Sequence, residues 1–229
     1  DDDCAEELLD IANAHADLLY IKTDGSLDDG MELVSHPCTM DYHINEFPWE
    51  DIMHRAIRQG YRSHQTSTCG LHLHVNRNAF SDNQEEQDEV ISRILYFVEH
   101  HWNELLKFSR RSEYTMNRWA ARYGYEHTPK AIMDKAKKGG NGRYAAVNLC
   151  NYHTVEFRLF RGTLKYNTFI ATIQLVNRIC DAAMYNTDDS IAKLSWSDFV
   201  ADVTEPELIQ YLKERQLYIN EEVQTEEEM

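Results

Sequence analysis

The chain has 229 residues, 42% of them hydrophobic, so it is long enough to bury a core within one domain. Its 23 Lys and Arg residues against 39 Asp and Glu residues give a formal charge of −16, which argues against nonspecific nucleic-acid binding, because that binding needs a basic surface. No run of apolar residues approaches the roughly 20 that a membrane-spanning helix needs.

Hydrophobic spacing predicts a mixture of helices and strands along the chain. In the first half we expect a helix over 4–17, short strands at 18–22 and around Glu32, a helix after Pro48, and a strand over 70–76. In the second half we expect a long helix over 83–109, a short helix from Pro129, a hairpin within 143–164, and helices over 167–184, 198–203 and 205–216.

Strands and helices do not alternate strictly in this order, which favours the α+β class. We therefore expect a largely antiparallel sheet with helices packed on one face, in a single domain over 1–220. The acidic segment 221–229 is expected to be a disordered tail. The five cysteines are odd in number, widely spaced and without a C-x-x-C pair, so we expect a reduced protein of the cytoplasm.

The expected strand at 154–161 carries chemistry on one of its faces. Successive side chains point to opposite sides of a strand, so Val155, Phe157 and Leu159 share the apolar face. Thr154, Glu156, Arg158 and Phe160 share the other face. An exposed acid and arginine side by side can also form a plain surface ion pair, worth roughly 0–1 kcal/mol.

The other two strands place polar side chains in the same alternating way. His72, His74 and Asn76 alternate with leucine and valine, and Glu32 lies in a similar short strand. If all three strands join one sheet, Glu32, His74, Glu156 and Arg158 converge on one face. Carboxylates and an imidazole suit a divalent cation, and an arginine suits phosphate oxygens.

Several alternatives remain open at this point. A zinc site built from Cys69, His72 and His74 is one, although the usual closed spacings of structural zinc are absent. A metal-dependent hydrolase using both histidines is another. Asp24 lies in a turn-rich segment, where an aspartate commonly serves the turn itself. The glycine-rich stretch 137–142, directly before Arg143, is a candidate lid.

Three segments in order resemble the amidoligase family: TDGSLDDGMELVSHP at 23–37, CGLHLHVN at 69–76 and RYAAVNLCNYHTVEFRLFRGTL at 143–164. The terminal segment WSDFVADVTEPELIQYLKER is also similar to family tails. That family is similar to the carboxylate–amine ligases related to glutamine synthetase and gamma-glutamylcysteine ligase. The resemblance implies a glutamine-synthetase-like catalytic domain, with a sheet curved around an active site and ATP at one end.

The resemblance also implies roles for individual residues. Metal ligands are implied at Asp24, Glu32, His74 and Glu156. Arg158 matches the arginine that holds the transferred phosphoryl group. Arg143, Asn76 and Asn148 match motif positions near the nucleotide or the acyl phosphate, so Arg143 joins Arg158 as a catalytic candidate.

The resemblance implies an ATP-dependent carboxylate–amine ligase with Mg²⁺ or Mn²⁺, acting on small-molecule or peptide substrates through an acyl phosphate. One expected feature is absent, because family members begin with a strand carrying a G-x-E-x-E acid pair and none precedes Cys4. The chain begins with Asp rather than Met, so we expect that a first strand is missing. A non-catalytic, nucleotide-binding relative is the alternative.

Overall fold

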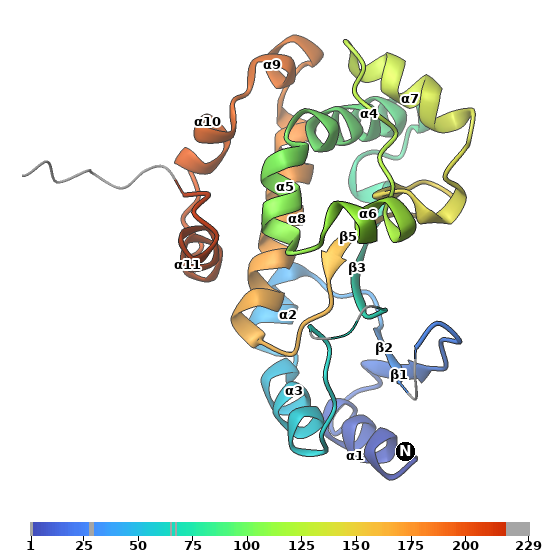
Figure 1. Ribbon diagram of the computed structural model, residues 1–229, viewed down its shortest axis with the longest axis vertical. Helices are drawn as coiled ribbons and strands as arrows, with labels where there is room; N and C mark the ends of the chain where they lie inside the picture. The colour runs from blue at the N-terminus through green and yellow to red at the C-terminus, as the bar shows by residue number, and fades with distance from the viewer. Residues whose placement is uncertain (1, 28–29, 65, 67, 219–229) are drawn as a thin grey trace, which may run out of the picture.

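The α+β class is confirmed by the computed structural model, which describes residues 2–27, 30–64, 66 and 68–218 (Figure 1). The expected tail at 221–229 lies outside the described residues. The first half contains α1 (Asp2–Ala12), β1 (Leu19–Lys22), β2 (Glu32–Ser35), α2 (Met40–Asn45), α3 (Trp49–Arg58), β3 (Gly70–Asn76), η1 (Arg77–Ala79) and α4 (Gln84–His100). The second half contains α5 (Trp102–Ser109), α6 (Glu113–Trp119), α7 (Pro129–Lys137), η2 (Gly142–Tyr144), β4 (Val147–Asn148), β5 (Thr154–Arg161), α8 (Tyr166–Tyr185), α9 (Asp188–Lys193), α10 (Trp196–Ala201) and α11 (Pro206–Glu214).

The described strands form two antiparallel sheets rather than one. β1 pairs with β2, while β5 lies between β3 and β4 in a separate three-stranded sheet. The condition that all three chemistry-bearing strands join one sheet is not met, because β2, which Glu32 begins, pairs with β1 and lies outside the β3–β5–β4 sheet. The expected hairpin within 143–164 is present as β4 and β5.

An irregularity in β5 changes the expected alternation of side chains. His74 pairs with Glu156 and Leu73 with Phe157, but Leu71 pairs with Phe160. Two residues of β5 thus oppose the single residue His72, which is the geometry of a β-bulge. As a result Phe160, predicted on the polar face, is only 2% exposed and lies in the core.

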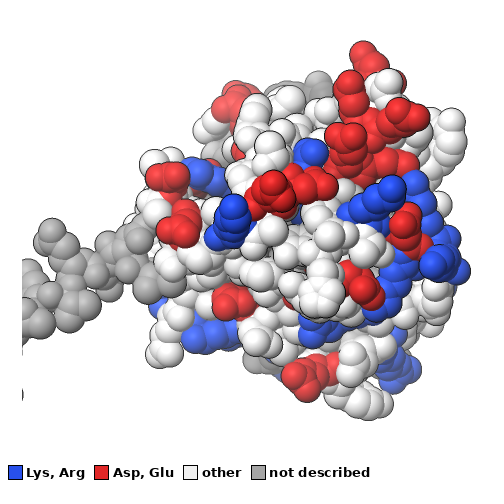
Figure 2. Space-filling view, turned by 90° about the horizontal axis from the view of Figure 1, so that it is seen from above, with Lys and Arg blue, Asp and Glu red and all other residues white. Residues whose placement is uncertain are grey.

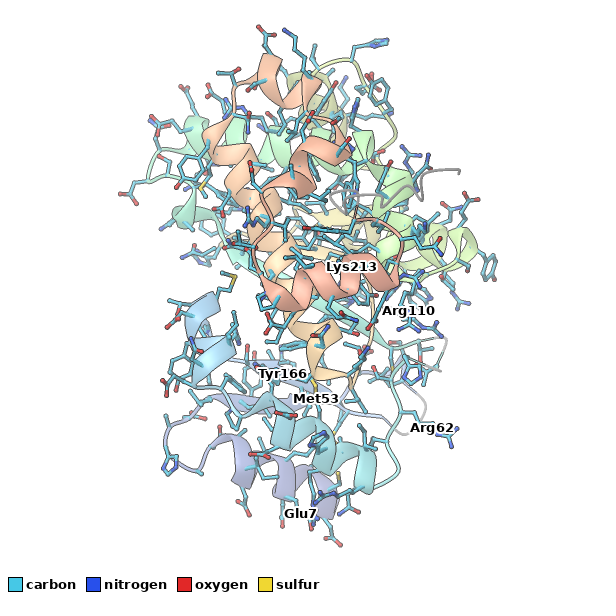
Figure 3. All side chains as sticks on the ribbon, turned by 90° about the vertical axis from the view of Figure 1, so that its left-hand side faces the viewer. Glu7, Met53, Arg62, Arg110, Tyr166 and Lys213 are labelled. Carbon is cyan, nitrogen blue, oxygen red and sulfur yellow. The ribbon has the colours of Figure 1, made fainter. Side chains whose placement is uncertain are left out.

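Helix α8 joins two hydrophobic cores. Near its start, Phe169 and Ile170 pack in the core formed with α1, α3 and β1, while its later residues pack against α4 and α11. Figure 3 shows Tyr166 and Met53 at the junction between the lower helices and α8, where the Tyr166 hydroxyl donates to the Ile44 carbonyl at 3.2 Å. No helix in the described part of the chain is both long and apolar enough to cross a membrane.

The predicted helix over 83–109 is two helices, α4 and α5, which meet at His101. His101 is 4% exposed, and its Nε2 donates to the Leu194 carbonyl at 3.0 Å. Its backbone (φ −102°, ψ 31°) departs from the helix. Hydrophobic spacing continues through this break, so the sequence pattern does not reveal it. The same pattern missed α2, α6 and α9, which have only six or seven residues each.

The buried His101 predicts a loss of stability in mild acid. Burial, with a smaller effect of His100, lowers the pKa of His101 to about 4, whereas an unfolded histidine has a pKa of about 6.5. The unfolded chain therefore binds the proton first, and stability present above pH 6.5 falls between about pH 6.5 and 4. Over this pH range, the free energy of unfolding measured with denaturant should fall by up to about 3 kcal/mol less in His101→Gln than in the parent. The exposed His15→Gln should match the parent, and an unchanged pH profile in His101→Gln would contradict the assignment.

Candidate active site

The candidate site lies on the face of the β3–β5 pair that carries polar side chains. Antiparallel pairing sets His74 directly opposite Glu156, and the bulge places His72 beside Arg158 along the same face. Strand β4 adds Asn148, which pairs with Glu156 from the other side. Three strands thus bring an acid, two imidazoles, an amide and a guanidinium together.

Glu156 is the centre of this group and is only 4% exposed. Its Oε2 accepts from Asn148 Nδ2 at 2.7 Å and from Asn151 Nδ2 at 3.2 Å, and its Oε1 accepts from Arg158 NH1 at 2.5 Å. Burial alone would raise the pKa of Glu156. The Asn148 hydrogen bond and the Arg158 charge outweigh burial, so the net pKa is lowered and the carboxylate stays ionised.

Both histidines of β3 approach the same carboxylate oxygen. His72 Nδ1 lies 3.4 Å and His74 Nε2 lies 3.7 Å from Glu156 Oε1. Burial, followed by the charge of Arg158, lowers the pKa of His72 to about 4, so this imidazole is neutral at pH 7. The other ring nitrogen of His74, Nδ1, lies 3.1 Å from Thr154 Oγ1. This contact ties the His74 ring to a side chain of β5. A neutral imidazole keeps a lone pair for a metal ion or a proton.

The guanidinium of Arg158 binds a carboxylate but does not use all of its hydrogen-bond donors. Its Nε is buried without a hydrogen-bond partner, although NH1 is bound to Glu156. Two guanidinium groups lie over the Tyr144 ring, that of Arg158 at 5.8 Å and that of Arg143 at 5.0 Å from the ring centroid. Arg143 also donates to the Tyr144 hydroxyl at 2.9 Å and is exposed at the rim of the site.

Asp24 reaches toward this group from the turn after β1. Its Oδ1 accepts from the Ser26 backbone at 2.9 Å, and this hydrogen bond is the largest cause of its lowered pKa. The charges of His72 and Arg143 lower the pKa of Asp24 further, so its carboxylate lies within electrostatic range of both. Asp24 thus serves its turn and lies within electrostatic range of the site.

The remaining predicted residues have other positions. In the described part of the chain, no hydrogen bond or ion pair joins Glu32 to the Glu156 group. Asn76 caps η1, accepting from the Asn78 backbone at 3.0 Å. Asn148 is 2% exposed and uses both ends of its amide, because its Oδ1 also accepts from Cys150 N at 2.9 Å. Asn148 therefore positions Glu156 in this structure.

The donor types at the site suit a divalent cation, since two imidazoles and a carboxylate are ligands of first-row metals. However, no group of three or more His, Cys, Asp or Glu side chains among the described residues is arranged to hold one. The Cys69, His72 and His74 side chains of the zinc alternative are therefore not arranged to hold a metal ion either. Arg158 occupies Glu156 Oε1, so a cation needs that guanidinium to move off this oxygen.

The loop between α7 and η2 leads directly into Arg143 and is flanked by cations of α7 and η2. Gly139 and Gly140 have φ values of 77° and 144°, a region that side chains rarely adopt. Lys and Arg gather on the right-hand side of the face in Figure 2, on the side where Figure 1 places α7. The exposed cations of this stretch are Lys130, Lys135, Lys137, Lys138 and Arg143.

Sequence reasoning underrated one member of the group, His72, and missed two more. His72 shares its face with His74 by simple alternation, so its signal was present. Asn151 lies in the turn between β4 and β5, and Tyr144 lies in η2. No spacing rule points to either of them, because turns carry no period.

Comparison with family models places the chain in a family. The model described as "Putative amidoligase enzyme" matches residues 12–180, which is more than half of the chain, so the chain belongs to this family. The matched range contains every site residue discussed above. Comparisons with curated proteins and with solved structures found no match.

The hydrogen bond from Asn148 predicts a measurable effect of its removal. In Asn148→Ala, Glu156 Oε2 keeps only the longer bond from Asn151, so the pKa of Glu156 should rise and folding should weaken by about 1–3 kcal/mol. Carboxyl ¹³C NMR titration and urea unfolding measure the two effects. The exposed Asn45–Asp41 bond, at 2.8 Å, provides the control Asn45→Ala, which should cost far less. Equal costs would contradict the central place of Glu156.

Proposed function

We propose that this member of the amidoligase family is an ATP-dependent carboxylate–amine ligase that forms an amide through an acyl phosphate. The observation that supports this most is the buried, ionised Glu156 held by Arg158, with two imidazoles at the same oxygen. Family membership supports amide-bond formation in general. ATP use, the acyl phosphate and the glutamine-synthetase-like curved sheet are parts of the proposal.

The chemistry explains why such a site needs these groups. A carboxylate does not react with an amine in water, because its oxygen is a poor leaving group. Transfer of a phosphoryl group to that oxygen gives an acyl phosphate, from which the amine displaces phosphate. A protein promotes both steps by positioning the reactants and by neutralising charge on the moving oxygens.

In this proposal each residue has a task. Arg158 binds the transferred phosphoryl group through its guanidinium, whose Nε lacks a hydrogen-bond partner among the described residues. Asp24, Glu32, His74 and Glu156 are the proposed metal ligands, with Glu32 the least supported by its position in the other sheet. Bound Mg²⁺ or Mn²⁺ supplies positive charge to the phosphates, and the imidazole of His74 favours Mn²⁺.

Other residues would orient the reactants. Asn148 keeps Glu156 in place, and Arg143 lies at the rim, where it can meet nucleotide or acyl phosphate. Asn76 remains a proposed nucleotide contact. The acid and the amine are proposed to be small molecules or peptides, and the proposed compartment is the cytoplasm, which fits five free cysteines.

The test is ADP formation by the protein with Mg²⁺ or Mn²⁺ and ATP, over a panel of acids and amines. ADP should form only when an acid and an amine are both present. Glu156→Gln and Arg158→Ala should each lower the rate at least a hundredfold, because charge stabilisation of this kind contributes about 10²–10³. The same site would be only a nucleotide-binding module if ATP bound without turnover.

A matched pair of control variants comes from the same chain. Arg178 and Glu205 form a similar ion pair, at 2.7 Å, between α8 and the start of α11. Arg178→Ala and Glu205→Gln should keep the activity of the folded protein. A Glu156→Gln enzyme as active as these controls would overturn the proposed function.

The basic loop at 137–142 is proposed as a lid over the bound phosphates, since closing it would exclude water from the acyl phosphate. Gly140→Pro should lower turnover severalfold, because proline cannot adopt a φ of 144° and stiffens the loop. Gly60→Pro makes a similar change at a φ of 88° at the end of α3 and should leave turnover intact. Unchanged turnover in Gly140→Pro at an unchanged melting temperature counts against the lid.

A further inference from the structure

We propose that Arg111, Arg158 and Arg161 form an oxyanion site at the Gly70 end of the β3–β5 pair. The site holds an anionic group of the acid substrate, beyond the carboxylate that reacts. The oxyanion site is argued from geometry and charge, whereas its assignment to the acid substrate rests on the proposed function.

The chain turns sharply to bring Arg111 to this place. Helix α5 ends at Arg110, whose φ of 59° is in the left-handed region. Arg110 lies beside α11, close to the hydroxyl of Tyr211 (Figure 3). The next residue, Arg111, extends instead to β3. The turn thus separates two neighbouring arginines onto different surfaces.

Gly70 makes room for the Arg111 guanidinium. A Cβ at Gly70 would lie 2.7 Å from Arg111 NH2 and 2.9 Å from His72 Nε2, so any larger residue would displace both side chains from these positions. The guanidinium therefore lies over the bare backbone of β3, next to an imidazole of the candidate site. Arg161 pairs with Gly70 across the strands, which brings the third arginine to the same end.

The positive charges of the arginines at the Gly70 end exceed the negative charge that the described residues place there. Arg158 binds Glu156, but within the described residues no carboxylate forms an ion pair with Arg111 or Arg161. Burial, together with the positive charges of Arg158 and Arg161, lowers the pKa of Arg111 to about 10. Three guanidinium groups close together with one carboxylate favour an added oxyanion, and guanidinium forks match carboxylate and phosphate geometry.

The order of groups along the strands indicates which reactant brings the anion. His74 and Glu156 lie at one end, Arg158 in the middle and Gly70 with Arg161 at the other end, about 13 Å from His74 at 3.3 Å per residue. If Arg158 holds the transferred phosphoryl group, His74 and Glu156 would be the residues nearest to the rest of the nucleotide. The opposite side, toward Arg111, is then left to the acid. The preferred acids would carry two anionic groups.

The test is isothermal titration of the protein with glutarate, acetate and inorganic phosphate, without ATP, metal or amine. Ionic strength is kept constant with NaCl, so that general screening is equal in all arms. Glutarate should bind about tenfold tighter than acetate. Arg111→Gln should weaken glutarate binding about tenfold, and Arg111→Lys should restore part of it, because lysine keeps the charge but not the fork.

Arg118→Gln, which removes an exposed arginine from the nearby α6, is the matched control and should bind like the parent. Absence of glutarate binding, or equal weakening in Arg118→Gln, would overturn the oxyanion site. Phosphate binding at Arg111 without glutarate binding would overturn its assignment to the acid substrate. Glutarate binding at Arg111 in a protein that never forms ADP would leave the oxyanion site standing and overturn the proposed function alone.

Discussion

The site depends on one carboxylate that is buried and still charged. Burial disfavours the ionised form of Glu156, and the Asn148 hydrogen bond and the Arg158 charge together reverse that preference. These partners come from β4 and from β5 itself, so the three-stranded sheet must be intact for the charge to persist. The cores on either side of α8 hold the sheet in place.

The types of polar side chain therefore change along the β3–β5 pair. Imidazoles approach the carboxylate at one end, and guanidinium groups gather toward the other, where Gly70 leaves the backbone open. The β-bulge in β5 is important here, because it moves Phe160 into the core and leaves Arg158 beside the single residue His72. A regular strand would place Phe160 on the polar face.

The sequence predicted those parts of the structure in which hydrophobic residues recur at regular spacing. The strands β3 and β5, helix α8, and the shared face of His72 and His74 within β3 all follow from spacing alone. Pairing between distant strands could not be predicted in this way, so Glu32 was placed in the wrong sheet. The break at His101 and the turn that directs Arg111 to the site depend on tertiary contacts, which leave no period in the sequence.

The central claim of the proposed function is that His74 and Glu156 help to hold a cation that meets phosphate, with His72 beside them. Paramagnetic broadening of histidine ring signals by Mn²⁺, in the presence of a non-hydrolysable ATP analogue, tests it most directly. The account predicts strong broadening of His72 and His74, loss of that effect in Glu156→Gln, and little change at the exposed His15 and His127. Broadening of all four rings alike, or of the exposed rings alone, would contradict it.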